Sequence, residues 1–378
     1  MRVLILFNFD LFCILKEWQQ EGHSGHHLWG ATELPKYGIE VDFLEYEKFK
    51  PLKQLSQKLR LLGDLDQQVR ILGCSHRYDA IFSAHHLTTA LLTFLRKVGL
   101  LRTPVISINH RALKKSLFAQ FYTALFVEGN DRVLCFSEAT KNHLQNDFGI
   151  ARSKLDVLPW CIDIEYEKLR KENIDYDLSS SQYILSSGRT FRDYETLLSA
   201  FEQIEYPLRI LGCSPVAGEK DVRSLFTDIS QVPANISFVD RFIPTPEAID
   251  EIKKAYAVAI PLKITPNEPG NTFGVTSLFE AMALGKAVII TRNNYLGIDV
   301  EREGIGLVVE PGDVDGWREA ITFLLKNPQR AQEMGRKGRY LIETKYNLEV
   351  FGKALTQQIL RAVDASKYPH VLQSNDLS

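Results

Sequence analysis

The sequence predicts an α/β protein of the doubly wound class, with enough residues for two domains. At 378 residues the chain exceeds the usual size of a single domain. Its hydrophobic share of 45% and charged share of 24% are those of a globular protein. Short apolar runs alternate with longer amphipathic stretches along the chain, and this alternation is typical of parallel strands connected by helices.

The composition indicates which classes of function and which cellular compartment to expect. A net charge of −2 gives no indication of nucleic-acid binding. The five cysteines are scattered and odd in number, which predicts neither a disulfide framework nor a zinc site and favours a reducing cytoplasm. The apolar start of the chain resembles a signal peptide, but Asp10 interrupts it and no small-residue cleavage site follows. We therefore interpret residues 2–7 as a buried strand, and no apolar run is long enough to span a bilayer.

Turn residues and apolar runs predict the next elements of the first half. A loop containing Gly22 and Gly25 follows the first strand, and we expect a helix over residues 26–36 and a strand over 39–44. The loop could place amides near a phosphate or near an acceptor, or it could be a plain turn. Leucines at helical spacing then predict one long helix over most of residues 47–70.

Polar residues follow three further predicted strands of the first half. These strands cover residues 79–83, 104–108 and 133–136. The first precedes His85 and His86, and the second precedes His110. A doubly wound sheet binds its ligands at the carboxyl ends of its strands, so these residues are candidates for a site.

The most informative stretch is residues 257–291, which is predicted to fold as strand, loop, helix and strand. Residues 257–262 fit a buried parallel strand, and prolines and a glycine break regular structure in the following loop. Thr276 or Ser277 is predicted to cap the helix. Its N-terminus would then face the carboxyl edge of the sheet, where a helix N-terminus favours an anion.

Glu280 lies about one turn into this predicted helix. From there it could accept hydrogen bonds from the ribose of a nucleotide while a phosphate meets the amides of Thr276 and Ser277. The alternative is an ordinary helix in which Glu280 is a solvated carboxylate favoured by the helix dipole. The pattern alone does not decide between the two.

The segment GVTSLFEAMALGKAVIIT resembles the donor-binding segment of GT-B glycosyltransferases, especially the retaining group 1 or family 4 type. This resemblance implies that Glu280 holds the ribose of a nucleotide sugar. Many members have a second Glu upstream with seven residues between, and here that position is Thr272. The resemblance implies that the donor site comprises Gly25, Gly188, Arg189, Arg192, Asn271, Thr272, Gly274, Thr276, Ser277 and Glu280.

The run SSGRTFRDYETLL also resembles the family, and it supplies the cations expected to grip the diphosphate. Arg189 matches the family arginine, while Arg192 matches the family lysine in a loop shortened by two residues. Guanidinium groups bind phosphate oxygens in a bidentate manner. We expect both arginines to act in catalysis by stabilising the leaving group, with two solvated loop arginines as the alternative.

On the acceptor side the resemblance implicates His110, at the place where retaining members often carry a His beside the donor sugar. It could bind a sugar hydroxyl or orient the acceptor, and we count it among the catalytic candidates without assigning it as the base. His85 and His86 are further acceptor-side candidates, and an ordinary structural role is the alternative for all three.

The resemblance implies a GT-B fold, in which two doubly wound Rossmann-like domains face each other across a cleft. We expect residues 1–164 to bind the acceptor and residues 183–347 to bind the nucleotide sugar, with residues 165–182 as the linker. A helix at residues 348–366 is expected to cross back to the first domain, and residues 367–378 are expected to form a mobile tail.

The expected function is transfer of a hexose from a nucleotide diphosphate sugar to an acceptor hydroxyl, with retention. No Asp-x-Asp pair follows a strand in the setting of a metal site, so we expect no metal and no cofactor besides the sugar donor. A sugar-nucleotide epimerase or hydrolase on the same fold remains an alternative, as does a non-catalytic nucleotide-sugar-binding partner subunit.

Basic residues among leucines suggest where the acceptor comes from. They occur at residues 48–60, 96–102 and 111–115, all in the expected acceptor domain. A basic amphipathic surface suits a cytoplasmic enzyme at the inner face of an anionic membrane, acting on a lipid, a lipid-linked glycan or a polysaccharide precursor. Solvated helix faces on a soluble domain are the alternative.

Overall fold

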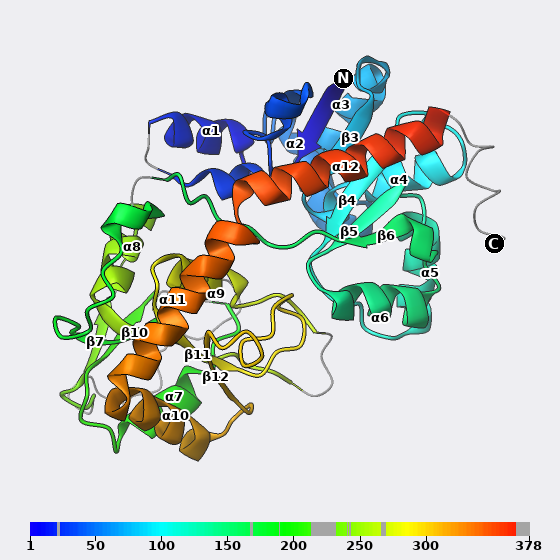
Figure 1. The fold of residues 1–378 in the computed structure, drawn as a ribbon. Coiled ribbons are helices and arrows are strands. Elements are labelled where there is room, and N and C mark those ends of the chain that lie inside the picture. Colours follow the sequence, from blue (N-terminus) through cyan, green and yellow to red (C-terminus); the bar gives the residue numbers. More distant parts are fainter. Residues whose placement is uncertain are drawn as a thin grey trace, which may run out of the picture.

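The computed structural model describes residues 1–20, 23–166, 169–188, 190–212, 232–239, 241, 243–265 and 270–367. Figure 1 shows two lobes, each built on a sheet with helices against it. Within the described residues each sheet has six strands, and every strand pairing in both sheets is parallel. The predicted doubly wound α/β class is therefore confirmed, with one sheet in each lobe.

The first sheet has the strand order β2-β1-β3-β4-β5-β6. Its strands are β1 (Arg2–Leu6), β2 (Glu40–Phe43), β3 (Ala80–Ser83), β4 (Val105–Asn109), β5 (Arg132–Cys135) and β6 (Leu155–Val157). Its helices are α1 (Leu11–Gln19), α2 (Lys50–Lys58), α3 (Leu65–Cys74), α4 (Ala90–Lys97), α5 (Leu117–Tyr122) and α6 (Glu138–Phe148). The central strands β3 and β4 are buried along their whole length, because helices cover both faces of a parallel sheet.

The second sheet has the order β12-β11-β10-β7-β8-β9. Its strands are β7 (Tyr183–Ser187), β8 (Leu208–Leu211), β9 (Ile236–Val239), β10 (Ala255–Ile260), β11 (Ala287–Thr291) and β12 (Gly306–Val309). The helices that follow are α7 (Tyr194–Phe201), α8 (Thr245–Lys254), α9 (Val275–Ala283), α10 (Val314–Lys326), α11 (Pro328–Thr344) and α12 (Leu348–Lys367). The apolar runs that form β10 and β11 are fully buried and support the loops above them.

Helix α12 leaves the second lobe and packs on the first sheet (Figure 1). Its residues Phe351, Leu355 and Ile359 are buried in the core that also contains strands β1, β3 and β4. The chain thus passes between the lobes twice. The two passages are hydrogen bonded to each other, since the Ile162 amide donates to the Tyr346 carbonyl at 2.9 Å.

Two predicted helices of the first domain are wrong in detail. The long helix expected over residues 47–70 is split into α2 and α3, because Gly63 has a left-handed backbone and Asp64 caps α3 through the Gln67 amide. The helix expected over residues 26–36 consists of two short 3-10 turns. Trp29 and Gly30 both have positive φ between these turns, which no continuous helix tolerates.

None of the described helices is long and apolar enough to cross a membrane. Lys367, the first residue of the predicted tail, is the last residue of α12, and residues 368–378 lie outside the described residues.

Candidate functional site

The loop after β7 lies at the topological switch point of the second sheet, where the strand order reverses. β7 and β10 are neighbours, but the chain between them builds β8 and β9 on the other side of β7. Doubly wound sheets bind ligands in the crevice at this point. Gly188 follows β7 with φ of +120°, and a Cβ there would lie 2.2 Å from the guanidinium of Arg192. Glycine adopts this φ without strain, whereas other residues rarely do.

The guanidinium of Arg192 holds this loop against α9. Nε donates to the Ser187 carbonyl at 3.2 Å, and Nη1 donates to the Thr190 carbonyl at 2.9 Å. Nη2 donates to Ser277 Oγ at 3.3 Å. Arg192 therefore positions residues on both sides of Arg189 in the sequence. A contact of Arg192 with phosphate would be additional to this role. Arg189 itself lies outside the described residues.

The N-terminus of α9 lies beside the loop after β7 and has no side-chain cap. The prediction that Thr276 or Ser277 caps this helix is wrong, because Gly274 is the N-cap with φ of +90° and no side chain caps the helix. Thr276 and Ser277 occupy the first turn, where an uncapped helix presents backbone amides to an anion. Ser277 Oγ also lies 3.3 Å from the Ser187 carbonyl, so α9 and the loop after β7 form one unit.

Glu280 lies one turn further along α9 and is partly buried. Burial raises the pKa of its carboxyl group to about 7. No hydrogen bond or ion pair to this carboxylate occurs among the described residues, so nothing there offsets the cost of its charge. A group that donates hydrogen bonds to Glu280 would supply what the surrounding protein lacks.

Three histidines stack at the carboxyl edge of the first sheet. The ring centroids of His85 and His86 are 5.3 Å apart, and those of His85 and His110 are also 5.3 Å apart. The structure thus brings together the three predicted acceptor-side residues from the loops after β3 and β4. Burial lowers the pKa of His85 to about 3 and that of His110 to about 4, and it also lowers the pKa of His86. All three rings are neutral near pH 7.

The partner of His110 defines its tautomer. Nε2 lies 2.6 Å from the Ala84 carbonyl, which can only accept, so Nε2 carries the proton of the neutral ring. Nδ1 is then a hydrogen-bond acceptor. This arrangement lets His110 accept a hydrogen bond from a hydroxyl group, but a pKa of about 4 does not favour it as a proton carrier near neutrality.

An aromatic cluster beneath His110 was missed by the sequence reasoning. The ring of His110 lies 5.6 Å from Trp29 and 5.0 Å from Phe136, and Trp160 packs against both of these rings. Trp29 has φ of 54°, which is costly for a bulky side chain and places its ring in this cluster. The Trp–Gly pair in HHLWG is the signal that could have indicated this turn.

The two domains meet directly beside these residues. Thr272 Oγ1 donates to the His110 carbonyl at 3.2 Å, and the Ala112 amide donates to the Gly270 carbonyl at 2.8 Å. Arg111 and Asn271 form a backbone bridge between these two contacts. The loop before α9 therefore lies on the His110 loop, and the predicted donor and acceptor residues share one interdomain contact.

Gly25 contacts the segment that connects the domains. Its amide donates to Asp163 Oδ2 at 2.8 Å, and an added Cβ would lie 2.8 Å from the same oxygen. Asp163 belongs to the segment that connects the domains, so Gly25 fixes the first domain to this connection. In this conformation the Gly25 amide is occupied by the Asp163 carboxylate.

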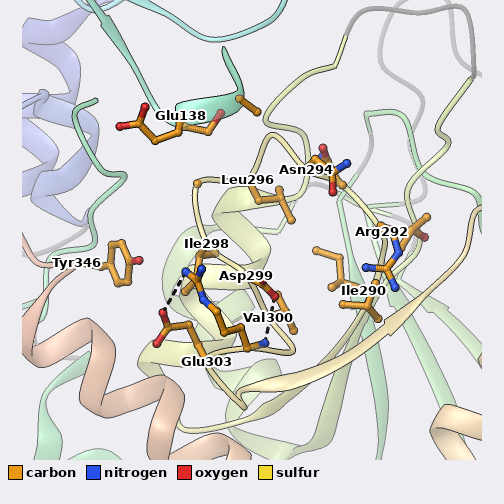
Figure 2. A pocket seen from close by; sticks show the side chains of 17 residues that line it. Glu138, Ile290, Arg292, Asn294, Leu296, Ile298, Asp299, Val300, Glu303 and Tyr346 are labelled. Atoms are coloured by element: carbon orange, nitrogen blue, oxygen red, sulfur yellow. Dashed lines mark hydrogen bonds and ion pairs between the residues drawn. The ribbon is translucent and has the colours of Figure 1, made fainter. Parts of the chain in front are cut away.

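A polar cavity of about 390 Å³ also lies between the domains, as Figure 2 shows. Glu138 at the start of α6 lines it from the first domain, opposite the loop after β11 with Asp299 and Glu303. Tyr346 lines a third side, where the chain passes between domains. Within the described residues, no group of three or more His, Cys, Asp or Glu side chains is placed to hold a metal ion.

Comparison with known families agrees with this architecture. The model of Glycosyltransferase Family 4 matches residues 14–166, and the model of Glycosyl transferases group 1 matches residues 171–340. The two matches together span most of the chain and correspond to its two lobes.

Two curated relatives are similar over part of their length. A D-rhamnosyltransferase, WbpZ of Pseudomonas aeruginosa, is 24% identical over 63% of this chain and 62% of its own. A GDP-mannose-dependent monoacylated alpha-(1-6)-phosphatidylinositol monomannoside mannosyltransferase of Corynebacterium glutamicum is 32% identical over 36% of this chain and 35% of its own. The chain therefore spans about 62% and 35% of these two relatives.

Solved structures share the fold along nearly the whole chain. HepE of Anabaena in complex with UDP has a TM-score of 0.66 at 14% identity, covering 95% of this chain and 100% of that one. A sucrose-phosphate synthase of Thermosynechococcus elongatus has a TM-score of 0.67 at 18% identity, covering 96% and 99%. The two family matches cover both lobes, each lobe is built on a parallel sheet, and loops of the two lobes are in contact. The chain therefore belongs to the group 1 glycosyl transferases and has the GT-B fold.

Proposed function

We propose that the protein transfers a hexose from a nucleotide diphosphate sugar to an acceptor hydroxyl. The observation that carries this proposal is the contact of Thr272 with the His110 carbonyl, which sets the loop before α9 against the histidine cluster. A donor seated on α9 would then present its sugar to the first domain. Transfer requires the donor sugar to lie close to the acceptor hydroxyl, and the same closeness keeps water away from the reacting carbon.

The donor is proposed to bind with its phosphates at the N-terminus of α9 and beside Arg189. Its ribose hydroxyls would donate hydrogen bonds to Glu280, whose carboxylate has no partner among the described residues. The neighbouring HepE structure holds UDP, and the name of the Corynebacterium relative includes GDP-mannose. These two relatives support the donor class but differ in the nucleotide base.

The chemistry is proposed to proceed with retention and without a metal ion. The bond between the anomeric carbon and the diphosphate oxygen breaks, and a bond from that carbon to the acceptor oxygen forms. The acceptor proton passes to the departing phosphate oxygen, whose negative charge Arg189 stabilises. Neutral His110 would orient a sugar hydroxyl through Nδ1, and this role requires no change in its charge.

The acceptor is proposed to be a lipid, a lipid-linked glycan or a polysaccharide precursor, reached from the cytoplasmic face of a membrane. The printed name of the Corynebacterium relative describes a phosphatidylinositol mannoside, which is a lipid-linked sugar. The first domain would bind it, because the histidine cluster lies on that domain.

Release of nucleotide diphosphate, measured with and without acceptors, tests the proposal. GDP-mannose and UDP-glucose are the first donors, tested with lipid extracts and soluble glycans as acceptors. Acceptor-dependent release is the expected result. Release without an acceptor indicates an epimerase or hydrolase, and binding without release indicates a non-catalytic subunit. Absence of binding to any nucleotide sugar would contradict the proposal.

A further inference from the structure

Helix α5 on the first domain exposes a continuous set of large apolar side chains. Leu117 is 86% exposed, Phe118 is 57% exposed and Phe121 is 61% exposed. Leaving such side chains in water is costly, and clusters of them mark surfaces that contact another molecule or a membrane.

The exposure of these side chains is not caused by a loosely attached helix. Ser116 caps α5, since its hydroxyl accepts from the Ala119 amide at 3.1 Å. The helix continues into a π-helical turn at Thr123–Val127, and Tyr122 at the end of α5 and Val127 at the end of this turn are buried in the core of the first domain. The buried side anchors α5, and the exposed apolar side faces outward.

Basic residues precede this apolar face in the sequence. Residues 80–127 contain no Asp or Glu and six Lys or Arg residues, which are Arg96, Lys97, Arg102, Arg111, Lys114 and Lys115. Arg96 and Lys97 pair with Asp131 and Glu128. Lys114 and Arg111 are exposed and have no ion pair among the described residues, while Lys115 pairs with Asp147 and stays 69% exposed. The free charges therefore lie directly before α5.

The loop that carries these charges also carries His110. It leaves β4 at the carboxyl edge of the first sheet, contacts the loop before α9 and ends at Ser116. An apolar and basic surface at this position lies at the acceptor side of the interdomain contact.

We infer that Leu117, Phe118 and Phe121, with Lys114 and Lys115, form a docking surface for an anionic lipid bilayer. Aromatic and leucine side chains would enter the boundary of the bilayer, and the lysines would face acidic headgroups. The exposed charges of Arg111 and Lys114, which have no ion pair among the described residues, favour this partner over a second copy of the chain, because two copies would bring like charges together at this face. The inference rests on the proposed function in one respect, since docking would bring a lipid-linked acceptor to His110.

This surface differs from the basic run expected at residues 48–60. Lys53 in that run is largely buried and pairs with Asp64 at 2.9 Å and with Glu47 at 3.6 Å. Lys48 pairs with Glu45 at 3.1 Å. Substitution of Lys53 would break an internal contact, so the loop before α5 offers the sharper test.

Sedimentation of the full-length protein with vesicles tests the inference. Phosphatidylcholine vesicles containing phosphatidylglycerol are compared with phosphatidylcholine alone, at low and at high salt. The wild type is expected to pellet with the anionic vesicles and to be released by salt. Lys114→Glu should weaken binding by about fivefold or more, and the pair Leu117→Ser and Phe118→Ser should weaken it further.

Matched controls carry equal changes elsewhere. Phe323→Ser with Tyr340→Ser alters two exposed aromatic side chains of the second domain, and Lys353→Glu reverses an exposed charge on α12. Both controls should pellet like the wild type. Absence of pelleting at low salt, or equal losses in the controls, would overturn the inference. A wild-type dimer that the α5 variants dissociate would assign the surface to a second copy.

Binding of nucleotide sugar by the same variants keeps the two proposals separate. The α5 variants are expected to bind the donor as the wild type does, because α5 lies apart from α9. If the wild type pellets with vesicles but binds no nucleotide sugar, the proposed function fails and the docking surface stands. If it binds and transfers but never pellets, the docking surface fails alone.

Discussion

At the scale of single residues, Glu280 is distinguished by a carboxyl group with a raised pKa and no partner among the described residues. A pKa of about 7 leaves the group mainly protonated at pH 6 and mainly ionised at pH 8. Ribose hydroxyls donate best to the ionised form. We therefore expect affinity for a nucleotide sugar to rise by about fivefold to tenfold from pH 6 to pH 8.

Calorimetry with the intact sugar nucleotide measures this dependence, because its diphosphate does not titrate near neutrality. Glu280→Gln should bind more weakly at pH 8 and show a nearly flat profile. The same linkage makes wild-type stability fall as the pH rises from about 4.5 to about 7 and level off above this range, since the folded state retains a proton that the unfolded state releases near pH 4.5. If Glu280→Gln leaves the pH dependence of nucleotide-sugar affinity unchanged, Glu280 does not bind the donor.

The neutral state of His110 leads to a second expectation. With a pKa of about 4, the ring does not change charge between pH 6 and pH 8. His110→Ala should lower kcat by about a hundredfold, as loss of one positioned hydrogen-bonding group does, and leave donor affinity nearly unchanged. Steady-state kinetics across this pH range should give profiles of the same shape for both proteins. A limb near pH 6 that disappears in the variant would show that His110 does transfer a proton.

Arg189 and Arg192 are expected to differ in what their loss changes. Arg189→Ala should lower kcat by orders of magnitude through loss of a phosphate contact, as the family resemblance implies. Arg192→Ala should lower stability by about 1–3 kcal/mol, because three hydrogen bonds of the loop are lost. Thermal unfolding beside kinetics separates the two effects. Near-normal turnover of Arg189→Ala would contradict its assignment.

At the scale of elements, the packing of α11 on α9 depends on a glycine. A Cβ at Gly335 of α11 would lie 1.8 Å from the Gly285 carbonyl oxygen, which is a backbone atom that cannot rotate away. We expect Gly335→Ala to destabilise the protein by about 2 kcal/mol or more, measured by urea unfolding.

Gly73 in α3 provides the matched control for this prediction. A Cβ at Gly73 meets no atom within 4 Å, so Gly73→Ala should be stabilising by about 0.5 kcal/mol through helix propensity. Equal stability of the two variants would contradict the close contact between α11 and α9. This contact bears on the site, because α11 supports the helix that carries Glu280.

At the scale of the whole molecule, the contact between the domains includes Gly297. Its φ is +79°, and an added Cβ would lie 2.1 Å from the Phe136 carbonyl oxygen of the other domain. Gly297→Ala should therefore push the domains apart beside the His110 cluster. Turnover should fall by about tenfold or more, because even a small misplacement of the reacting groups slows catalysis.

Donor affinity of Gly297→Ala should change little, because the predicted donor contacts lie mainly on the second domain. Gly304→Ala is the control, with a similar φ of +66° but a Cβ contact with the tip of the flexible Lys337 side chain at 2.9 Å. Small-angle scattering should show an increased radius of gyration for Gly297→Ala alone. Identical kinetics of the two variants would show that this contact is not needed for turnover.

The sequence by itself determined the fold class, because buried parallel strands read as apolar runs and their order follows from alternation with helices. It also indicated β10, α9, β11 and Glu280, since these residues are adjacent in the chain. The break between α2 and α3 was not predicted from the sequence. The helical spacing of leucines continues across it, although Gly63 forms a turn and Asp64 caps the second helix.

Only the tertiary structure decided which distant residues meet. The stack of His85 on His110, the Trp29 ring beneath it and the contact of Thr272 with the His110 carbonyl join segments that no local pattern links. Protonation belongs to the same level, because desolvation depends on everything packed around a group and not on its neighbours in sequence. The neutral His110 and the proton on Glu280 near pH 7 are therefore properties of the folded chain.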